Sequence, residues 1–261
     1  MEKINLTDFQ KRKFKKFYIV IYIITKKIRI RTDSCITNKD LYILCGVDIM
    51  GNREMLGIYF NNEYDNKYWL EKFEDIKARG VEKILFFVTP QNRNIERCLK
   101  ILYNDVIIEN SPDRIYTKIS KYFAIKKCRK MQINLKDLFL KENIEQYKIS
   151  LKLFKEMYAD NKIIRKMLED NEKEIENFYK YNHLIRKLLY PYYLIREIQK
   201  NLNKINTKEK LCTNLNEVIE VFMPYIHTFE KGRSYSKIEW LELISNIYDE
   251  YKNILEEYIN E

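Results

Sequence analysis

Glycine and proline are scarce in this sequence, which has five glycines and four prolines among 261 residues. Nucleotide-binding loops use glycine where the backbone must approach a phosphate closely, as in G-x-x-x-x-G-K-[ST] or G-x-G-x-x-G. Neither motif is present. The sequence therefore argues against a protein that binds nucleotides through a glycine-rich loop.

Histidine and cysteine also give little sign of a metal site or a disulfide framework. The two histidines, His183 and His227, are far apart in the sequence, and we interpret both as structural residues. The five cysteines, at positions 35, 45, 98, 128 and 212, are odd in number and form no C-x-x-C pair. Such cysteines suit a reducing compartment, so we expect a cytoplasmic protein without structural zinc.

The apolar run Phe17–Ile24 follows the basic segment "KRKFKK". A helix that crosses a bilayer needs about 20 apolar residues, so this run is too short for one. It is rich in β-branched and aromatic residues, which favours a buried strand. We expect neither a signal peptide nor membrane association.

Positive charge is present in excess, with a net charge of +10. Lys and Arg side chains bind polyanions with the release of counterions, so nucleic acid is the first partner to consider. The alternative is a basic protein with a solvated lysine surface. The 46% hydrophobic and 14% aromatic content indicates a globular chain that can bury a core.

The first half of the sequence alternates between strand and helix patterns. Tyr18–Ile24, continued with period 2 through "KIRIR", predicts a long strand, and Leu41–Val47 with Met55–Phe60 predicts a hairpin around "MGNRE". The segment "NKYWLEKFEDIKARG" predicts a helix that ends at Gly80. A buried strand at "VEKILFFV", a helix at Glu96–Tyr103 and a short strand at "DVIIEN" follow.

The second half, from about Ser120, has only helical patterns. Apolar residues recur at helical spacing in Leu138–Met157 and Lys162–Leu189, after Pro191, and again in Asn216–Phe222 and Ile238–Ile259. The sequence therefore predicts an α/β part followed by an α-helical part.

Several collinear segments resemble one family. "NKDLYILCGVDIMGNREMLGIYF" and then "YWLEKFEDIKARGVEKILFFV" resemble the catalytic region of mutator-type bacterial insertion-sequence transposases. The similarity runs from about Arg12 to Ile119 and resumes at Ile175–Ile205. It begins almost at Met1, so we expect a chain that is shortened at its N-terminus relative to the family.

The resemblance implies an RNase H-like mixed sheet that carries a DDE triad of acids. It also implies a helical insertion between the second and third acid. The expected division is an RNase H-like α/β core at 1–119, a helical insertion at 120–190, and helices at 191–261 that complete the core and form a C-terminal tail.

The positions that match the three acids of the family carry no acid here. The resemblance puts them on Ile24, on Pro90 in "ILFFVTPQNRN", and on Arg196 in "YPYYLIR". A C-x-x-H pair of the family falls on Ser111 and Arg114.

A small shift of this alignment does not restore the triad. No acid occurs between Phe9 and Thr32, and the acids nearest to Pro90 are Glu82 and Glu96. Glu197 follows Arg196 directly, but consecutive residues of a helix point about 100° apart.

The loss of the acids also removes the expected metal site. The family chemistry uses two divalent ions, normally Mg²⁺, and these ions prefer carboxylate oxygens. Three carboxylates would carry −3, whereas Ile, Pro and Arg carry +1. We therefore expect no catalytic residues, no bound Mg²⁺ or other cofactor, and no strand cleavage or transfer.

Two basic segments are candidates for nucleic-acid binding. The arm consists of Lys11, Arg12, Lys13, Lys15 and Lys16. A stripe of Arg196, Lys200 and Lys204 repeats at i, i+4 and i+8 on one face of the helix after Pro191. The alternatives are charges that keep an aggregation-prone strand soluble and an ordinary solvated helix face. Tyr190, Tyr192 and Tyr193 suit either stacking on bases or packing in a core.

Asp48 and Glu54 flank the turn of the predicted hairpin in "LCGVDIMGNREMLGIYF". One interpretation makes them metal ligands. The interpretation that we favour makes Asp48 a turn residue and Glu54 a solvated charge at the end of a strand.

The sequence thus predicts an inactive, transposase-like protein that retains the family fold and DNA binding. Two alternatives remain. The chain is either a repurposed, non-enzymatic DNA-binding or regulatory protein, or an interaction module that pairs with an intact, related transposase. We also consider a homo-oligomer.

Overall fold

The computed structural model describes residues 6–32, 35–61, 66–205 and 211–259. The chain forms two compact units. Unit 1 consists of Met1–Glu109 and Tyr193–Glu261, and unit 2 of Asn110–Tyr192. The predicted insertion, residues 120–190, falls inside unit 2, which also includes residues 110–119 that the sequence assigned to the α/β core.

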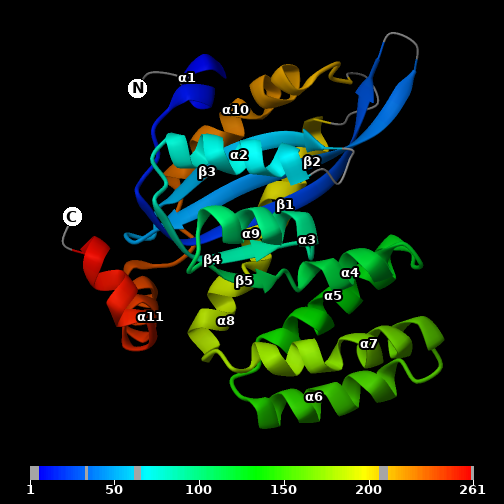
Figure 1. Ribbon diagram of the computed structural model, residues 1–261. Coiled ribbons are helices and arrows are strands. Elements are labelled where there is room, and N and C mark those ends of the chain that lie inside the picture. Colours follow the sequence, from blue (N-terminus) through cyan, green and yellow to red (C-terminus); the bar gives the residue numbers. More distant parts are fainter. Residues whose placement is uncertain (1–5, 33–34, 62–65, 206–210, 260–261) are drawn as a thin grey trace. The chain divides into compact units, whose positions relative to one another are not determined.

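Unit 1 contains a five-stranded mixed sheet (Figure 1). Its strand order is β3-β2-β1-β4-β5. The strands are β1 (Phe17–Arg31), β2 (Ile36–Asp48), β3 (Arg53–Asn61), β4 (Lys83–Thr89) and β5 (Ile107–Asn110). All five correspond to predicted strands, so the α/β class is confirmed.

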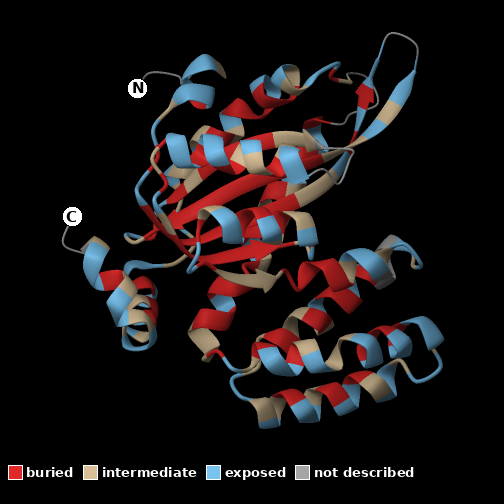
Figure 2. Ribbon diagram, in the orientation of Figure 1, coloured by how far each residue is buried: buried red, intermediate tan, exposed pale blue. Residues whose placement is uncertain are grey.

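The central strands pair along most of their length. β1 pairs antiparallel with β2, and β2 pairs antiparallel with β3. β1 pairs parallel with β4 from Phe17 opposite Lys83 to Tyr22 opposite Val88. Figure 2 shows these strands as largely buried, which explains why β4 has an almost unbroken apolar sequence.

Two helices pack on one face of the sheet. They are α2 (Asn66–Ala78) and α3 (Arg93–Leu102). Trp69 and Phe73 of α2 are 0% and 1% exposed, and they share a core cluster with strand residues such as Tyr18. Burial of each such side chain contributes about 1.5–3 kcal/mol. The side chain of Asn92 accepts hydrogen bonds from the N–H groups of Asn94 and Ile95, which fixes the start of α3.

The other helices of unit 1 are α1 (Leu6–Lys11), α9 (Tyr192–Ile205), α10 (Leu215–Lys231) and α11 (Lys237–Ile259). Figure 1 shows α10 behind the sheet, opposite α2 and α3. Phe86 of β4 meets Tyr251 of α11 edge to face, with ring centroids 5.4 Å apart. The sheet is therefore covered on both faces.

Unit 2 contains the helices α4 (Asp113–Ser120), α5 (Ile125–Phe139), α6 (Ile144–Met157), α7 (Lys162–Phe178) and α8 (His183–Leu189). The predicted helical stretch Lys162–Leu189 is divided into α7 and α8, and Leu138–Met157 covers the end of α5 and all of α6. Asn143 caps the start of α6 and Asn182 caps the start of α8. In the described segments of the chain, no helix is long and apolar enough to cross a membrane.

Candidate functional site

Ile24 and Pro90 lie near the point where the pairing of β1 with β4 ends. The last paired residues of the parallel strands β1 and β4 are Tyr22 and Val88. Ile24 and Pro90 each follow two residues later; Ile24 continues in β1, paired with Ile43 of β2, whereas Pro90 lies just beyond the end of β4. Phe86, four residues before Pro90, contacts Tyr251 of α11. Ile24 is 4% exposed.

Arg196 approaches this edge from α9. Lys26 stands two residues beyond Ile24 on the same face of β1. Burial lowers the pKa of Lys26, and the positive charge of Arg196 lowers it further. Arg196 Nη1 donates to Gln199 Oε1 at 2.6 Å. The positive charge of Arg196 on α9 therefore acts on the part of β1 that follows Ile24.

Glu197, the acid next to Arg196, is engaged elsewhere. Its Oε2 lies 3.2 Å from Nη1 of Arg53, and its Oε1 accepts a hydrogen bond from the Tyr225 hydroxyl at 3.0 Å. Arg53 is itself buried, and its Nε donates to the carbonyl of Phe229 at 3.1 Å. Glu197 thus balances a buried guanidinium.

The side chains at this edge do not fit a divalent cation. Ile24 and Pro90 offer no donor atom, and Lys26 and Arg196 are basic. Among the residues that the structure describes, no three His, Cys, Asp or Glu side chains lie close enough together to hold a metal ion. Since Mg²⁺ prefers carboxylate oxygens, the donors present do not match the two-metal site that the family resemblance implies.

Asp48 closes the turn between β2 and β3. Its Oδ1 accepts hydrogen bonds from the backbone N–H groups of Met50 at 2.9 Å and Asn52 at 2.8 Å. Its Oδ2 accepts one from the Asn52 side chain at 3.0 Å. Gly51 in the same turn has a φ of 79°, a conformation that suits glycine. The interpretation of Asp48 as a turn residue is confirmed.

Glu54 is not the solvated charge that we expected. It is half-buried and accepts a hydrogen bond from the hydroxyl of Tyr18. Burial raises the pKa of Glu54, although the hydrogen bond from Tyr18 and the charge of Arg12 partly offset this effect. The reason for the error is that Tyr18 reaches Glu54 across the sheet, a contact that the sequence does not reveal.

The basic arm divides into exposed lysines and one enclosed arginine. Lys11, Lys13, Lys15 and Lys16 are exposed. Arg12 instead forms a bidentate ion pair with Glu230 of α10, in which Nη1 lies 3.0 Å from Oε2 and Nη2 lies 2.6 Å from Oε1. It also donates a hydrogen bond to the carbonyl of Met55. Arg12 therefore does not present its guanidinium to a phosphate, contrary to the expectation from sequence.

The stripe on α9 is less uniform than its spacing suggests. Lys200 and Lys204 are exposed, whereas Arg196 is half-buried. Lys204 Nζ donates to Asn201 Oδ1 at 2.9 Å. The structure thus separates Arg196, at the sheet edge, from two lysines on the solvent side of the helix.

The remaining sequence candidates lie in or beside unit 2. Ser111 is buried, and Arg114 is buried in an ion pair with Glu174 of α7. Tyr190 is 2% exposed and packs against Phe139, with ring centroids 5.5 Å apart, whereas Tyr193 of unit 1 is 76% exposed. The packing interpretation therefore holds for Tyr190.

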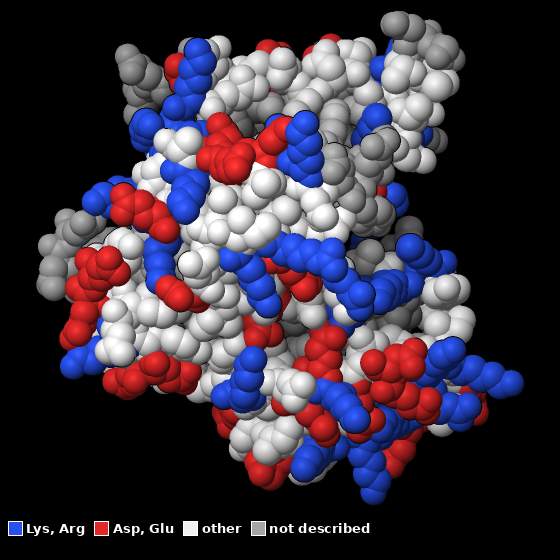
Figure 3. Space-filling view, in the orientation of Figure 1, with Lys and Arg blue, Asp and Glu red and all other residues white. Residues whose placement is uncertain are grey.

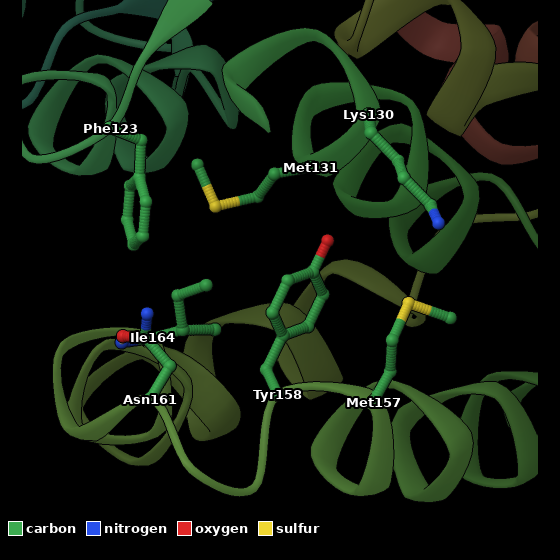
Figure 4. Close-up of a pocket in the computed structure, with 7 residues that line it drawn as sticks. All are labelled: Phe123, Lys130, Met131, Met157, Tyr158, Asn161 and Ile164. Atoms are coloured by element: carbon green, nitrogen blue, oxygen red, sulfur yellow. The ribbon is translucent and has the colours of Figure 1, made fainter. Parts of the chain in front are cut away.

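One pocket of about 330 Å³ lies within unit 2 (Figure 4). Its described lining is Phe123, Lys130, Met131, Met157, Tyr158, Asn161 and Ile164. Asn161 uses its side-chain oxygen to cap α7 through the N–H of Ile164, at 3.1 Å. Lys130 is the charged residue in this lining, and no carboxylate or histidine accompanies it there. The lining therefore offers no acid–base pair.

Sequence reasoning missed one basic surface. Arg93, Arg97 and Lys100 are all exposed on α3. Their i, i+4 and i+7 spacing is visible in "RNIERCLK", and it is the same signal that drew attention to α9.

A mixed sheet of order β3-β2-β1-β4-β5, covered by helices on both faces and interrupted in sequence by a helical unit, defines an α/β protein with a helical insertion. Residues 2–223 match the sequence profile of the family described as "Transposase, Mutator family". The chain belongs to this family.

Three curated relatives are bacterial. The chain is 20% identical over 199 residues to the transposase for insertion sequence element ISRM3 of Rhizobium meliloti (strain 1021), a match that covers 76% of this chain and 50% of the relative. A probable ISRM3-like transposase of Sinorhizobium fredii is 19% identical over the same shares of both chains. A probable transposase for an insertion sequence element of Corynebacterium diphtheriae is 18% identical over 87% of this chain and 66% of the relative. The chain spans about half the length of the first two relatives.

Proposed function

We propose that this chain is a transposase-like protein that binds DNA without cutting or joining it. The proposal includes an RNase H-like assignment of the sheet. The strand order, the antiparallel β1–β2–β3 meander and the parallel β1–β4 pair support that assignment.

One observation carries the proposal. The positions matched to the family acids carry Ile24, Pro90 and Arg196, and none of these residues has a carboxylate. These positions offer two side chains without donor atoms and one cation. Lys26, whose pKa is lowered by burial and by the charge of Arg196, adds a second basic side chain.

The charge at this edge opposes two-metal chemistry. Two divalent ions must be balanced by several carboxylates, and a site with Lys26 and Arg196 repels them. Glu197 does not compensate because its carboxylate is shared between Arg53 and Tyr225. The same positive charge favours a phosphate group, which is consistent with the net charge of +10.

The test is a cleavage assay with a designed positive control. The unmodified chain is incubated with labelled duplex DNA and Mg²⁺ or Mn²⁺, beside the variant Ile24→Asp/Pro90→Asp/Arg196→Glu. Calorimetric titration with Mn²⁺ is run on both proteins, and EDTA controls accompany each reaction. We expect no nicking and no Mn²⁺ binding by the unmodified chain.

The triple variant tests the geometry independently of activity. If its circular dichroism spectrum is that of a folded protein, the three new carboxylates should bind Mn²⁺, because the family alignment assigns them to one metal site. EDTA-sensitive nicking by the unmodified chain would refute the inactive assignment. A folded triple variant without Mn²⁺ affinity would instead refute the alignment of the three positions.

A further inference from the structure

Helix α3 presents a row of basic side chains to solvent. Arg93, Arg97 and Lys100 stand at i, i+4 and i+7, which places them within about 60° of one another around the helix axis. All three are exposed. Figure 3 shows Lys and Arg side chains gathered over α3, on the face of unit 1 that α2 and α3 cover.

Nearby acids do not neutralise this row. In the described part of the chain, neither an ion pair nor a side-chain hydrogen bond is found for Arg93, Arg97 or Lys100. Glu96, the acid of α3, is half-buried. Asp105, which follows α3, is paired with Lys83 at 2.5 Å. Among the residues that the structure describes, the three cations of this row therefore have no ion-pair partner.

The helix that carries these cations packs against the core through its opposite side. Its opposite side consists of Ile95, Cys98 and Leu99, which are 0%, 2% and 0% exposed. Asn92 caps its first turn. A ligand that contacts the basic row therefore has to order only the side chains, because the backbone is already fixed.

A second group of cations starts at the same edge of the sheet. β4 ends beside Tyr22, and α3 begins a few residues later, whereas β1 and β2 continue past this edge as a two-stranded ribbon. Lys27, Arg29 and Arg31 alternate along β1 and are exposed. Lys27 is paired with Asp40 at 2.7 Å, so the ribbon is partly neutralised and α3 is the stronger candidate.

We infer that the basic row of α3 binds the phosphate backbone of double-stranded DNA. Seven residues of helix span about 10.5 Å, and successive phosphates of one strand are about 3.4 Å apart along the duplex axis. Arg93 and Lys100 therefore reach phosphates about three steps apart on one strand, with Arg97 between them. Such contacts give affinity without reading the base sequence. The inference rests on the proposed DNA binding and names the surface responsible for it.

The experiment compares the DNA affinity of variants that lose two or three positive charges from different surfaces. The test variant is Arg93→Gln/Arg97→Gln/Lys100→Gln. The matched control, Lys148→Gln/Lys152→Gln/Arg165→Gln, removes three exposed charges from unit 2. A third protein, Lys200→Gln/Lys204→Gln, examines the stripe on α9. Binding to a labelled duplex without sequence preference is measured by fluorescence anisotropy over a series of salt concentrations, and thermal unfolding verifies that each variant folds.

Each phosphate contact contributes about 0.9 to the slope of log K against log [salt]. We expect the α3 variant to lose about 2 to 3 from this slope and to bind roughly a hundredfold more weakly at about 0.1 M salt. The control and the α9 variant should lose less than about one unit of slope.

The outcomes distinguish failure of the α3 surface assignment from failure of the proposed DNA binding. If the unmodified chain binds duplex DNA but the α3 variant loses no more DNA affinity and salt slope than the control variant, the inference is wrong and the proposed function stands. The inference is also overturned if only the α9 variant loses DNA affinity, or if the unmodified chain binds an RNA of equal length more tightly than the DNA duplex. If the unmodified chain shows no salt-dependent DNA affinity, the proposed function itself fails.

Discussion

Replacement of Arg12 by alanine should destabilise unit 1 and leave DNA affinity almost unchanged. The side chains of Arg12 and Glu230 are only 15% and 17% exposed, and two N–O contacts of 3.0 Å and 2.6 Å join them. Removal of one partner from a buried pair costs about 3–5 kcal/mol, because the other charge is left without compensation. Since both groups keep some solvent contact, we expect about 3 kcal/mol for Arg12→Ala.

A double-mutant cycle measures the pair itself. We expect Arg12→Ala and Glu230→Ala each to cost about 3 kcal/mol, and the double variant to cost about 2 kcal/mol less than their sum. Urea unfolding followed by tryptophan fluorescence is the appropriate assay, because Trp69 and Trp240 both belong to unit 1. Lys15→Ala, in the same arm but exposed, is the control and should stay within about 0.5 kcal/mol of the unmodified chain.

The reasoning fails if Arg12→Ala costs less than about 1 kcal/mol, or if the two single changes are additive. A large fall in DNA affinity with unchanged stability would restore the sequence-based assignment of Arg12 as a phosphate contact.

Three further changes test other contacts. The pKa of Glu54 is raised on folding, so protonation of Glu54 stabilises the native state, and this stabilisation is lost as pH rises from the unfolded-state pKa through the raised one. Urea titrations at several pH values should therefore show Glu54→Gln gaining stability relative to the unmodified chain over that pH window. A stability difference that does not change with pH would contradict this. Gly232→Ala places a Cβ against Nη2 of Arg53, whose buried guanidinium donates to the carbonyls of Phe229 and Gly232. We expect a loss of about 2–3 kcal/mol in the free energy of unfolding, and a loss below about 0.5 kcal/mol would show that Arg53 moves freely. Asp48→Ala removes the acceptor of two turn N–H groups and should cost about 1–2 kcal/mol in the same assay, whereas a neutral effect would mean that water replaces the carboxylate.

The strands were predictable because their chemistry is local. β1 and β4 are rich in β-branched and aromatic residues, which favour strands, and the hairpin is marked by Asp48 and Gly51. The helix breaks of unit 2 were not predictable from periodicity, because Asn143 and Asn182 are tolerated inside a helix. Their effect as caps depends on backbone geometry that forms only in the folded chain.

At the candidate site, too, contacts between residues far apart in the sequence could not be predicted. Family resemblance assigned the positions of the three acids to Ile24, Pro90 and Arg196. The role of Arg12 was missed because its partner, Glu230, is 218 residues away in the sequence. No local pattern distinguishes a basic side chain that meets a distant carboxylate from one that remains in solvent.

The division of unit 1 into two stretches of chain has a consequence for its synthesis. A ribosome adds about 5–20 residues per second, so all five strands emerge several seconds before α9 and α10 do. Unit 2 is one continuous stretch and can complete its packing during that delay. Meanwhile, the apolar face of the nascent sheet lacks its cover, and Arg12 and Arg53 have not yet met Glu230 and Glu197. The period of greatest risk for aggregation is therefore built into the order of the sequence, and it ends only when the C-terminal helices arrive.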